Sequence, residues 1–310
     1  MGKLAEHRPA ECELACPEEI VVATDLVDTE RLIPYAVAQA KAAGAGLTFV
    51  HAVPPEDLAE VKPNLAMIDL LSPRTAMEDV ARRVRAEGVS CSTVVSTGPV
   101  ADVVDEVLRR TKAGRLIVAT HARKGVDKFL QGSVAGKLLE SVDVPVLIVG
   151  PQCATATTNW NVHRMLVACS SLDKRTPKTM VVRALAKQSN AELIMLHVLP
   201  PDRHANQPVR SAHAVEESNL EPHGGDAGQS VSLRVTTGDP AVEIVRVANE
   251  ISADLIVLGV HHSMFRLPFG KETTAYKVLA SASCPVLTLR SDSALIRKHA
   301  LTETRRMAAL

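Results

Sequence analysis

Two short polar stretches in the first half of the chain have residue types suited to binding an anion. Gln131-Gly132-Ser133 comes directly before an expected helix, and Thr24-Asp25 directly follows an apolar run. A helix N-terminus offers free backbone N–H groups, glycine lets an oxyanion approach the backbone, and a serine hydroxyl adds a hydrogen bond. The pattern predicts an anion site, with helix capping as the ordinary alternative role of Ser133.

Hydrolytic and metal chemistry lack a recognisable motif. The sequence contains no Gly-x-Ser-x-Gly elbow, no Walker sequence with its Lys-Ser/Thr, and no GxGxxG after either predicted first strand. No pair among the histidines and the six cysteines has the spacing of a known zinc motif. We therefore assign no catalytic residue and no metal ligand.

Four histidines occupy repeated positions in the two halves. His51 and His197 end an apolar run in each half, where a histidine usually has a structural hydrogen bond rather than a catalytic role. His121 and His261 follow another apolar run, in a segment expected to face a ligand. Either of that second pair could brace its loop or contact a phosphate, and both interpretations stay open.

An internal repeat organises the chain. The segment TGPVADVVDEVLRRTKAGRLIVATHARKG has a counterpart in TGDPAVEIVRVANEISADLIVLGVHHS. Three residues recur 140 positions later without a gap: Gly98 as Gly238, His121 as His261, and Pro145 as Pro285. Earlier segments match at offsets of 145 and 146, so the connection between the second and third strands is shorter in the second half.

Five short apolar runs in each half are typical of strands buried on both faces of a parallel sheet. In the first half they are Ile20–Thr24, Leu47–Val53, Val89–Ser96, Leu116–Thr120 and Val146–Val149. In the second half they are Met165–Cys169, Leu193–Leu199, Val231–Val235, Leu255–Gly259 and Val286–Leu289. Amphipathic segments between them, such as Ala241–Ile251, have helical spacing.

Strict alternation of strands and helices defines the fold class as α/β. It predicts two tandem, doubly wound, five-stranded parallel-sheet (Rossmann-like) domains with right-handed crossovers. In such sheets ligands bind beyond the carboxyl ends of the strands, where the strand order reverses. The candidate segments therefore follow the first and fourth strands of each half, as Thr24-Asp25 and the stretch from Ala119 do.

The boundaries follow from composition. We expect an N-terminal tail (1–17), a first domain (18–150), a polar Thr-rich linker (151–161), a second domain (162–290) and a basic C-terminal helix (291–310). That helix would pack on its own domain or on a neighbouring chain. Within the Pro- and Gly-rich connection 200–229, we expect one helical stretch near Ser211–Leu220.

The charge balance and hydropathy exclude several classes of partner. Lys plus Arg and Asp plus Glu number 35 each, so the chain lacks the basic excess that nucleic acids or anionic membranes attract. No apolar run reaches the ~18 residues of a membrane helix, and the N-terminal residues lack the apolar core of a signal peptide. We expect a cytoplasmic protein whose cysteines are reduced.

Taken together, these motifs resemble the universal stress protein (UspA) family. The resemblance rests on VVATD, LTFVHAV, LIVATHARKG, LQGSVAGKLL and VDVPVLIVG in the first half, and on the same order of elements in the second. It implies an adenine nucleotide alpha hydrolase-like fold. It also implies that the two domains form an internal pseudo-dimer, similar to the homodimer of single-domain members.

ATP-binding members of that family carry Gly-x2-Gly-x9-Gly-Ser/Thr after the fourth strand and an Asp after the first. Here Asp25, Gly132 and Ser133 match with the spacing intact, whereas Ala119 and Ala122 replace the earlier glycines. Asp25 would contact ribose or adenine, or else cap the following helix. The resemblance implies these nucleotide-binding residues: Thr24, Asp25, Val118, Ala119, His121, Ala122, Gly132, Ser133 and Val134.

The second half departs further from the family motif. It keeps Gly259 but has His262 for the second glycine, Glu272-Thr273 for Gly-Ser, and Cys169-Ser170 after the first strand. Because Glu272 would put a carboxylate where phosphate binds, the resemblance implies at most one site, for ATP or AMP with Mg²⁺, in the first domain.

Three functions remain open at this point. The first is a cytoplasmic stress-response module that binds or regulates, pairing internally and also able to form homodimers. The second is a slow ATPase or nucleotide hydrolase at Asp25, Gly132 and Ser133. The third is a structural dimerisation protein that binds no nucleotide.

Overall fold

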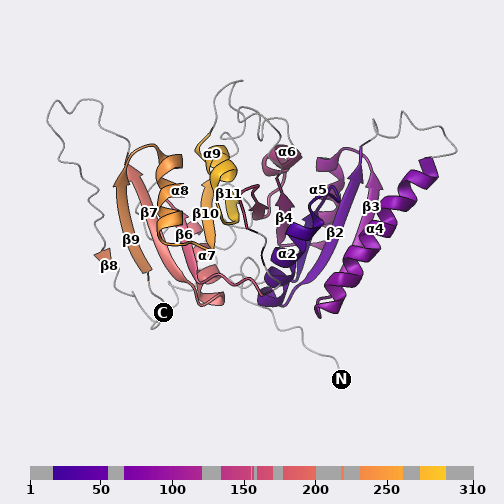
Figure 1. Cartoon of the computed structure of the whole chain (residues 1–310), viewed down its shortest axis with the longest axis horizontal. Coiled ribbons are helices and arrows are strands. Elements are labelled where there is room, and N and C mark those ends of the chain that lie inside the picture. Colours follow the sequence, from indigo (N-terminus) through magenta and orange to yellow (C-terminus); the bar gives the residue numbers. More distant parts are fainter. Residues whose placement is uncertain are drawn as a thin grey trace, which may run out of the picture.

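A single mixed sheet runs through the molecule. The computed structural model describes residues 17–54, 66–120, 134–154, 156, 159–169, 177–199, 218–219, 231–260 and 273–290. Within these residues, eleven strands form one sheet in the order β3-β2-β1-β4-β5-β11-β10-β6-β7-β9-β8. Each half of the chain supplies one side of it (Figure 1).

The first half alternates strands and helices as expected. Its elements are β1 (Glu19–Ala23), α2 (Thr29–Ala43), β2 (Gly46–Val53), α4 (Ala66–Ala86), β3 (Cys91–Thr97), α5 (Val100–Thr111), β4 (Arg115–Ala119), α6 (Val134–Ser141) and β5 (Val146–Val149). All four strand pairs within this half are parallel. The chain builds outward from β1 to β3 and then returns to place β4 and β5 on the other side. This is the doubly wound arrangement predicted from the apolar runs.

The second half repeats the arrangement with one addition. Its elements are β6 (Arg164–Ala168), α7 (Pro177–Gln188), β7 (Glu192–Leu199), β8 (Ser218–Asn219), β9 (Val231–Thr237), α8 (Pro240–Glu250), β10 (Leu255–Val260), α9 (Thr274–Ser281) and β11 (Val286–Arg290). The helix expected near Ser211–Leu220 is wrong at two residues, because Ser218 and Asn219 pair antiparallel with β9. The rest of that stretch, and the C-terminal segment 291–310, lie outside the described residues.

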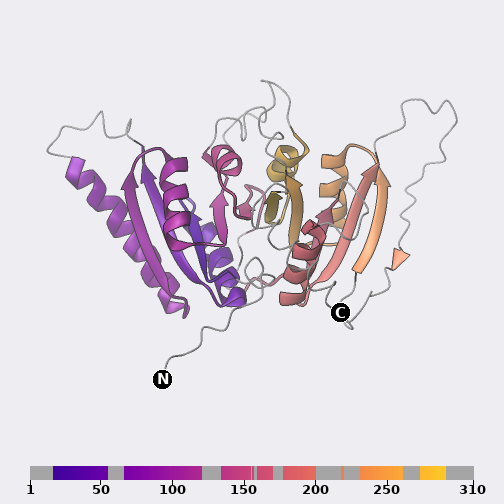
Figure 2. The ribbon, with the colours of Figure 1, turned by 180° about the vertical axis from the view of Figure 1, so that it is seen from behind.

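The two halves meet through their fifth strands. β5 and β11 run antiparallel, with Val146 opposite Thr288, Leu147 opposite Leu287 and Ile148 opposite Val286. Antiparallel pairing of equivalent strands relates the two halves by a local pseudo-twofold axis. Seen from either side, the halves flank this central junction, with α6 and α9 next to it (Figures 1 and 2). The internal pseudo-dimer is therefore joined by main-chain hydrogen bonds.

Apolar cores on both faces of the sheet run across the junction. One core contains side chains of α5, α6, α8 and α9, and the other contains side chains of α2, α4 and α7. Neighbouring residues of a strand point to opposite faces, so Val21 joins the first core and Val22 the second. Because each core includes residues from both halves, neither half buries its apolar surface alone.

The segment between the halves also packs against the first half. The hydroxyl of Tyr35 on α2 donates a hydrogen bond to the carbonyl of Ala154 at 2.8 Å. The rings of Tyr35 and Trp160 lie edge to face, with centroids 4.9 Å apart. The thiol-bearing residue Cys153 is buried beneath them. The described part of this segment is thus a packed connection.

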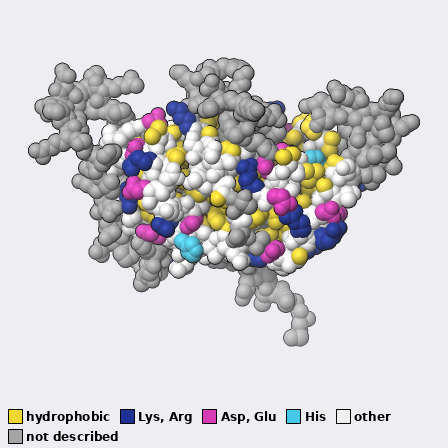
Figure 3. Space-filling view, viewed as in Figure 1, with side chains coloured by type: hydrophobic (Ala, Val, Ile, Leu, Met, Phe, Trp, Pro, Cys, Tyr) yellow, Lys and Arg dark blue, Asp and Glu magenta, His cyan; other side chains and the backbone are white. Residues whose placement is uncertain are grey.

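Charged side chains of both signs are interspersed over the face shown in Figure 3. This distribution agrees with the equal numbers of basic and acidic residues in the sequence. Among the described helices, none combines the length and the apolar character needed to cross a bilayer.

Candidate functional site

The carboxyl ends of β1 and β4 form the switch point of the first half. These strands are parallel neighbours, and Ala23 lies opposite Val118 in the register. Beyond β1 the chain turns toward β2, and beyond β4 toward β5, so the edge between them is open to a ligand. The structure therefore brings Thr24 and Asp25 beside the end of β4.

The remaining candidate residues are placed unevenly. Val118 is only 3% exposed, so a ligand there would meet its backbone, while Ala119 at the strand end is partly exposed. Val134 is the first residue of α6, which makes the amino end of α6 the start of a described helix. Four candidates lie outside the described residues: His121, Ala122, Gly132 and Ser133.

The turn after β1 is fixed by its own side chains. The hydroxyl of Thr24 accepts a hydrogen bond from the Leu26 amide at 2.9 Å, and a carboxylate oxygen of Asp25 accepts one from the Val27 amide at 3.0 Å. Leu26 adopts a φ of 72°, which is unusual for a residue with a Cβ. The N-cap of α2 is Asp28. Asp25 therefore braces the turn, and the alternative that it caps the helix is wrong.

His51 holds the same turn from the neighbouring strand. Its Nδ1 donates to the carbonyl oxygen of Thr24 at 2.9 Å, and in the second half Nδ1 of His197 donates to the carbonyl oxygen of Cys169 at 2.9 Å. Because the acceptor is a carbonyl, the proton resides on Nδ1 in both rings. The repeat of this contact supports the structural interpretation of both histidines.

Arg31 is a site-edge residue that the sequence patterns do not reveal. Its guanidinium donates to the carbonyl oxygens of Thr120 at 2.9 Å and Gly150 at 3.0 Å, and it pairs with the Asp28 carboxylate at 2.8 Å. One side chain from α2 thus ties together the residues that follow β4 and β5. The acceptors are backbone atoms far away in sequence, so no motif marks this role.

The equivalent edge of the second half has different chemistry. Cys169 occupies the position of Thr24, and burial raises the pKa of its thiol to about 11, so it is neutral at physiological pH. Thr273 caps α9, its hydroxyl accepting from the Tyr276 amide at 3.3 Å. His261, His262, Ser170 and Glu272 lie outside the described residues.

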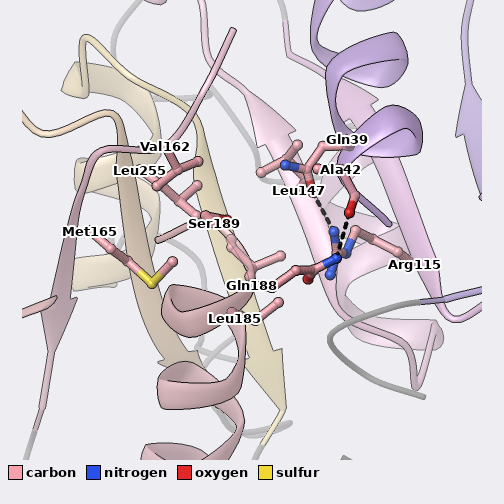
Figure 4. Close-up of a pocket in the computed structure, with 11 residues that line it drawn as sticks. Gln39, Ala42, Arg115, Leu147, Val162, Met165, Leu185, Gln188, Ser189 and Leu255 are labelled. Carbon is pink, nitrogen blue, oxygen red and sulfur yellow. Dashed lines mark hydrogen bonds between the residues drawn. The ribbon is translucent and has the colours of Figure 1, made fainter. Parts of the chain in front are cut away.

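A separate small pocket lies at the junction, near the amino ends of the strands (Figure 4). Arg115 at the start of β4 is 3% exposed and donates to the side-chain oxygen of Gln39. Gln188 of α7 donates to the carbonyl of Ala42 at 2.9 Å, which links the two halves. The pocket has a volume of ≈ 20 Å³, which accommodates about one water molecule. It is therefore too small for a nucleotide.

No group of three or more metal-ligating side chains occurs in the part of the chain that the structure describes. The carboxylates and thiols described here serve turns, caps and cores.

Fold and edge geometry define this chain as a tandem pair of Rossmann-like α/β domains that share one sheet. The model of the universal stress protein family matches residues 18–150 and 161–290. Since these matches cover most of the chain, the protein belongs to the universal stress protein family and carries two of its domains in tandem.

Solved structures with the same fold include two-domain proteins. A universal stress protein from Archaeoglobus fulgidus DSM 4304 is 18% identical with a TM-score of 0.66, covering 88% of this chain and 96% of its own. A protein of unknown function from Pseudomonas aeruginosa PAO1 is 20% identical with a TM-score of 0.59, covering 95% and 99%. A universal stress protein from Archaeoglobus fulgidus in complex with dAMP is 20% identical with a TM-score of 0.34, covering 43% and 98%. A search of curated proteins gives no match.

Proposed function

We propose that this protein is a cytoplasmic stress-response module that binds or regulates and has one adenine-nucleotide site, in its first domain (18–150). The observation that carries the proposal is the position of Thr24 and Asp25 beside the end of β4, at the switch point of the first half. The Gly132-Ser133 pair stands directly before α6 in the chain. Phosphate bound at the amino end of α6 would interact favourably with its backbone N–H groups and dipole.

The second domain (162–290) is proposed to bind no nucleotide. A neutral, buried thiol at Cys169 replaces the hydroxyl of Thr24, and Glu272 replaces the glycine before the last helix. A carboxylate at that position would repel phosphate at close range. The second domain then serves mainly as the pairing partner of the first.

The proposed ligand is ATP or AMP, with Mg²⁺ accompanying the triphosphate. The exposed carboxylate of Asp25 suits a ribose or adenine hydrogen bond, since its other known role is to hold the turn. Methyl groups at Ala119 and Ala122 would narrow the approach to ribose and phosphate, which predicts weak binding.

Calorimetric titration with ATP, AMP and dAMP tests the site. Wild-type protein should bind one equivalent, and Gly132→Glu, which copies the second half, should abolish binding because the new carboxylate meets the phosphate. Val242→Glu is the matched control, because it adds one carboxylate to the first turn of α8 at a residue that is 63% exposed. It should bind as the wild type does.

Equal binding by wild-type protein and Gly132→Glu would reject the assigned pocket. If wild-type protein binds nothing and the double variant Ala119→Gly, Ala122→Gly binds nucleotide, the chain is a structural pseudo-dimer with a disabled site. Release of inorganic phosphate from ATP, measured in the same samples, separates binding from slow hydrolysis.

A further inference from the structure

The second half reaches across the junction to the last turn of α6. Arg290, the final residue of β11, donates to the carbonyl oxygens of Val142 at 2.9 Å and Glu140 at 3.4 Å. Its guanidinium also lies 3.3 Å from the carboxylate of Asp143. The side chain of Arg290 is only 12% exposed, whereas that of Asp143 is 68% exposed. The buried contacts of the guanidinium are thus mainly with the carboxyl end of α6.

These contacts match what a helix end requires. The last carbonyls of a helix have no partner within the helix, and a cation there interacts favourably with the helix dipole. α6 has only eight residues, a length at which an isolated helix is unstable in water. A hydrogen-bonded cap at one end therefore contributes a large part of what keeps the whole of α6 formed.

The corresponding contact in the opposite direction is absent from the described residues. Gly150 ends the first half 140 positions before Arg290, and the repeat aligns the two. A Cβ on Gly150 would lie 2.9 Å from the carbonyl oxygen of Leu279 in α9. Backbone therefore approaches α9 where a side chain caps α6.

This asymmetry follows the difference between the two motifs. The helix that receives the cation, α6, follows the retained Gly132-Ser133, and the helix that does not, α9, follows Glu272-Thr273. We propose that Arg290 is a positioning residue: from the second domain, it holds α6 so that its amino end can bind phosphate in the first. The inference rests on the proposed function. It assigns the second domain a role in setting the nucleotide affinity of the first.

The two ends of α6 are then thermodynamically linked. An anion at the amino end and a guanidinium at the carboxyl end both favour the formed helix, so each increases the affinity of the other. Nucleotide should accordingly protect the backbone amides of α6 from hydrogen exchange, and loss of Arg290 should expose them.

The experiment compares wild type, Arg290→Ala, Arg290→Lys and Gln188→Ala. Gln188→Ala is the matched control, because it also removes a hydrogen bond between the halves but lies at the opposite edge of the sheet. AMP and ATP binding is measured by calorimetry, and exchange of the α6 amides by mass spectrometry with and without AMP. Urea denaturation reports the overall stability of each variant.

In Arg290→Ala we expect nucleotide affinity to fall about tenfold, or about 1.4 kcal/mol, and α6 to exchange faster by a similar factor. Arg290→Lys should recover most of the affinity, since it keeps a cation at the helix end. Gln188→Ala should lose stability while keeping wild-type affinity. Recovery by lysine and the unaffected control would distinguish positioning from a general loss of stability.

Two results would overturn the inference alone: wild-type affinity in Arg290→Ala, or an equal loss in Gln188→Ala. If wild-type protein binds neither nucleotide, the proposed function fails and the linkage fails with it. Exchange of α6 would still show whether Arg290 stabilises the helix, so the two failures are distinguishable.

Discussion

Arg31 shows how much of the candidate edge depends on single side chains that bind backbone. Its hydrogen bonds reach the residues after β4 and β5 and the carboxylate of Asp28. The guanidinium is pre-organised as a planar fork, so one side chain satisfies carbonyls from two strands. Its loss would leave polar groups at this edge without their protein partner.

Arg31→Ala should lower the free energy of unfolding by about 2 kcal/mol, because hydrogen bonds to a charged group are each worth about 1.5–3 kcal/mol and some are replaced by water. Urea denaturation measures the change. Arg82→Ala is the control, since Arg82 forms a pair with Asp79 while its side chain is 76% exposed. That variant should change stability by less than about 0.5 kcal/mol, and equal losses in both variants would contradict the role of Arg31.

The buried thiols should be unreactive near neutral pH. Burial raises the pKa of Cys153 to about 11 and that of Cys284 to about 12. Only the thiolate reacts, so iodoacetamide at pH 8 should modify both residues far more slowly than in urea, as followed by peptide mass mapping. Rapid native-state modification of either residue would contradict their burial.

The same thiols predict a loss of stability at alkaline pH. An unfolded thiol ionises near pH 8.5, below its folded pKa, so the neutral thiols stabilise the fold fully below that pH. The contribution is lost as pH rises through about 11. Urea midpoints between pH 8 and 11 should fall less steeply in Cys153→Ala than in wild-type protein.

At this scale the sequence predicted types better than contacts. Thr24 and Asp25 were placed at the switch point because polar residues directly follow an apolar run. Arg31 and Arg290 were not found, since each binds carbonyl oxygens that every residue possesses. No pattern of side-chain types encodes such a partner.

At the scale of elements, the equivalent helices α5 and α8 begin differently. Both follow a glycine with positive φ, Gly98 at 144° and Gly238 at 157°. Pro99 precedes α5 without a side-chain cap, whereas the carboxylate of Asp239 accepts from the amides of Ala241 and Val242. Those backbone hydrogen bonds, that of Val242 first, lower the pKa of Asp239.

Asp239→Ala should destabilise the protein by about 1 kcal/mol, the usual value of an N-cap. Asp239→Asn should retain most of this, because an amide oxygen can also accept. The lowered pKa means that the carboxylate stabilises the fold above the unfolded pKa near 3.9, and that the contribution disappears as pH falls through the folded value. A wild-type denaturation midpoint for Asp239→Ala at pH 7 would contradict the cap.

The strands and most helices were predictable because they are long or strongly patterned. Continuous apolar runs indicated the strands of both halves, usually to within a residue or two of their ends. The two-residue strand β8 was not predicted, since two residues carry no periodicity and their pairing with β9 depends on tertiary structure.

For the whole molecule, the junction of β5 and β11 is the feature that the repeat did not determine. An internal duplication indicates two copies of a fold, but not which surfaces of the copies meet. Here equivalent strands pair antiparallel, and both cores continue across them. The copies therefore form one cooperative unit.

Gly150→Ala tests this junction. The added methyl would lie 2.9 Å from the carbonyl oxygen of Leu279, a backbone atom of the other half that cannot rotate away. We expect a loss of about 1–3 kcal/mol, as for overpacking in a core, seen as a lower urea midpoint. Gln152→Ala, at an exposed neighbouring position, should be neutral. If Gly150→Ala were equally neutral, the close approach of the halves would be disproved.

Joining two copies in one chain also changes how mutations act on them. In a homodimer of identical subunits, every substitution strikes both binding sites at once. In this chain the shared sheet fixes a one-to-one stoichiometry at any concentration, while each copy mutates independently. One copy can therefore lose a site and gain a residue such as Arg290 that serves the other, a division of labour that a symmetric assembly cannot encode.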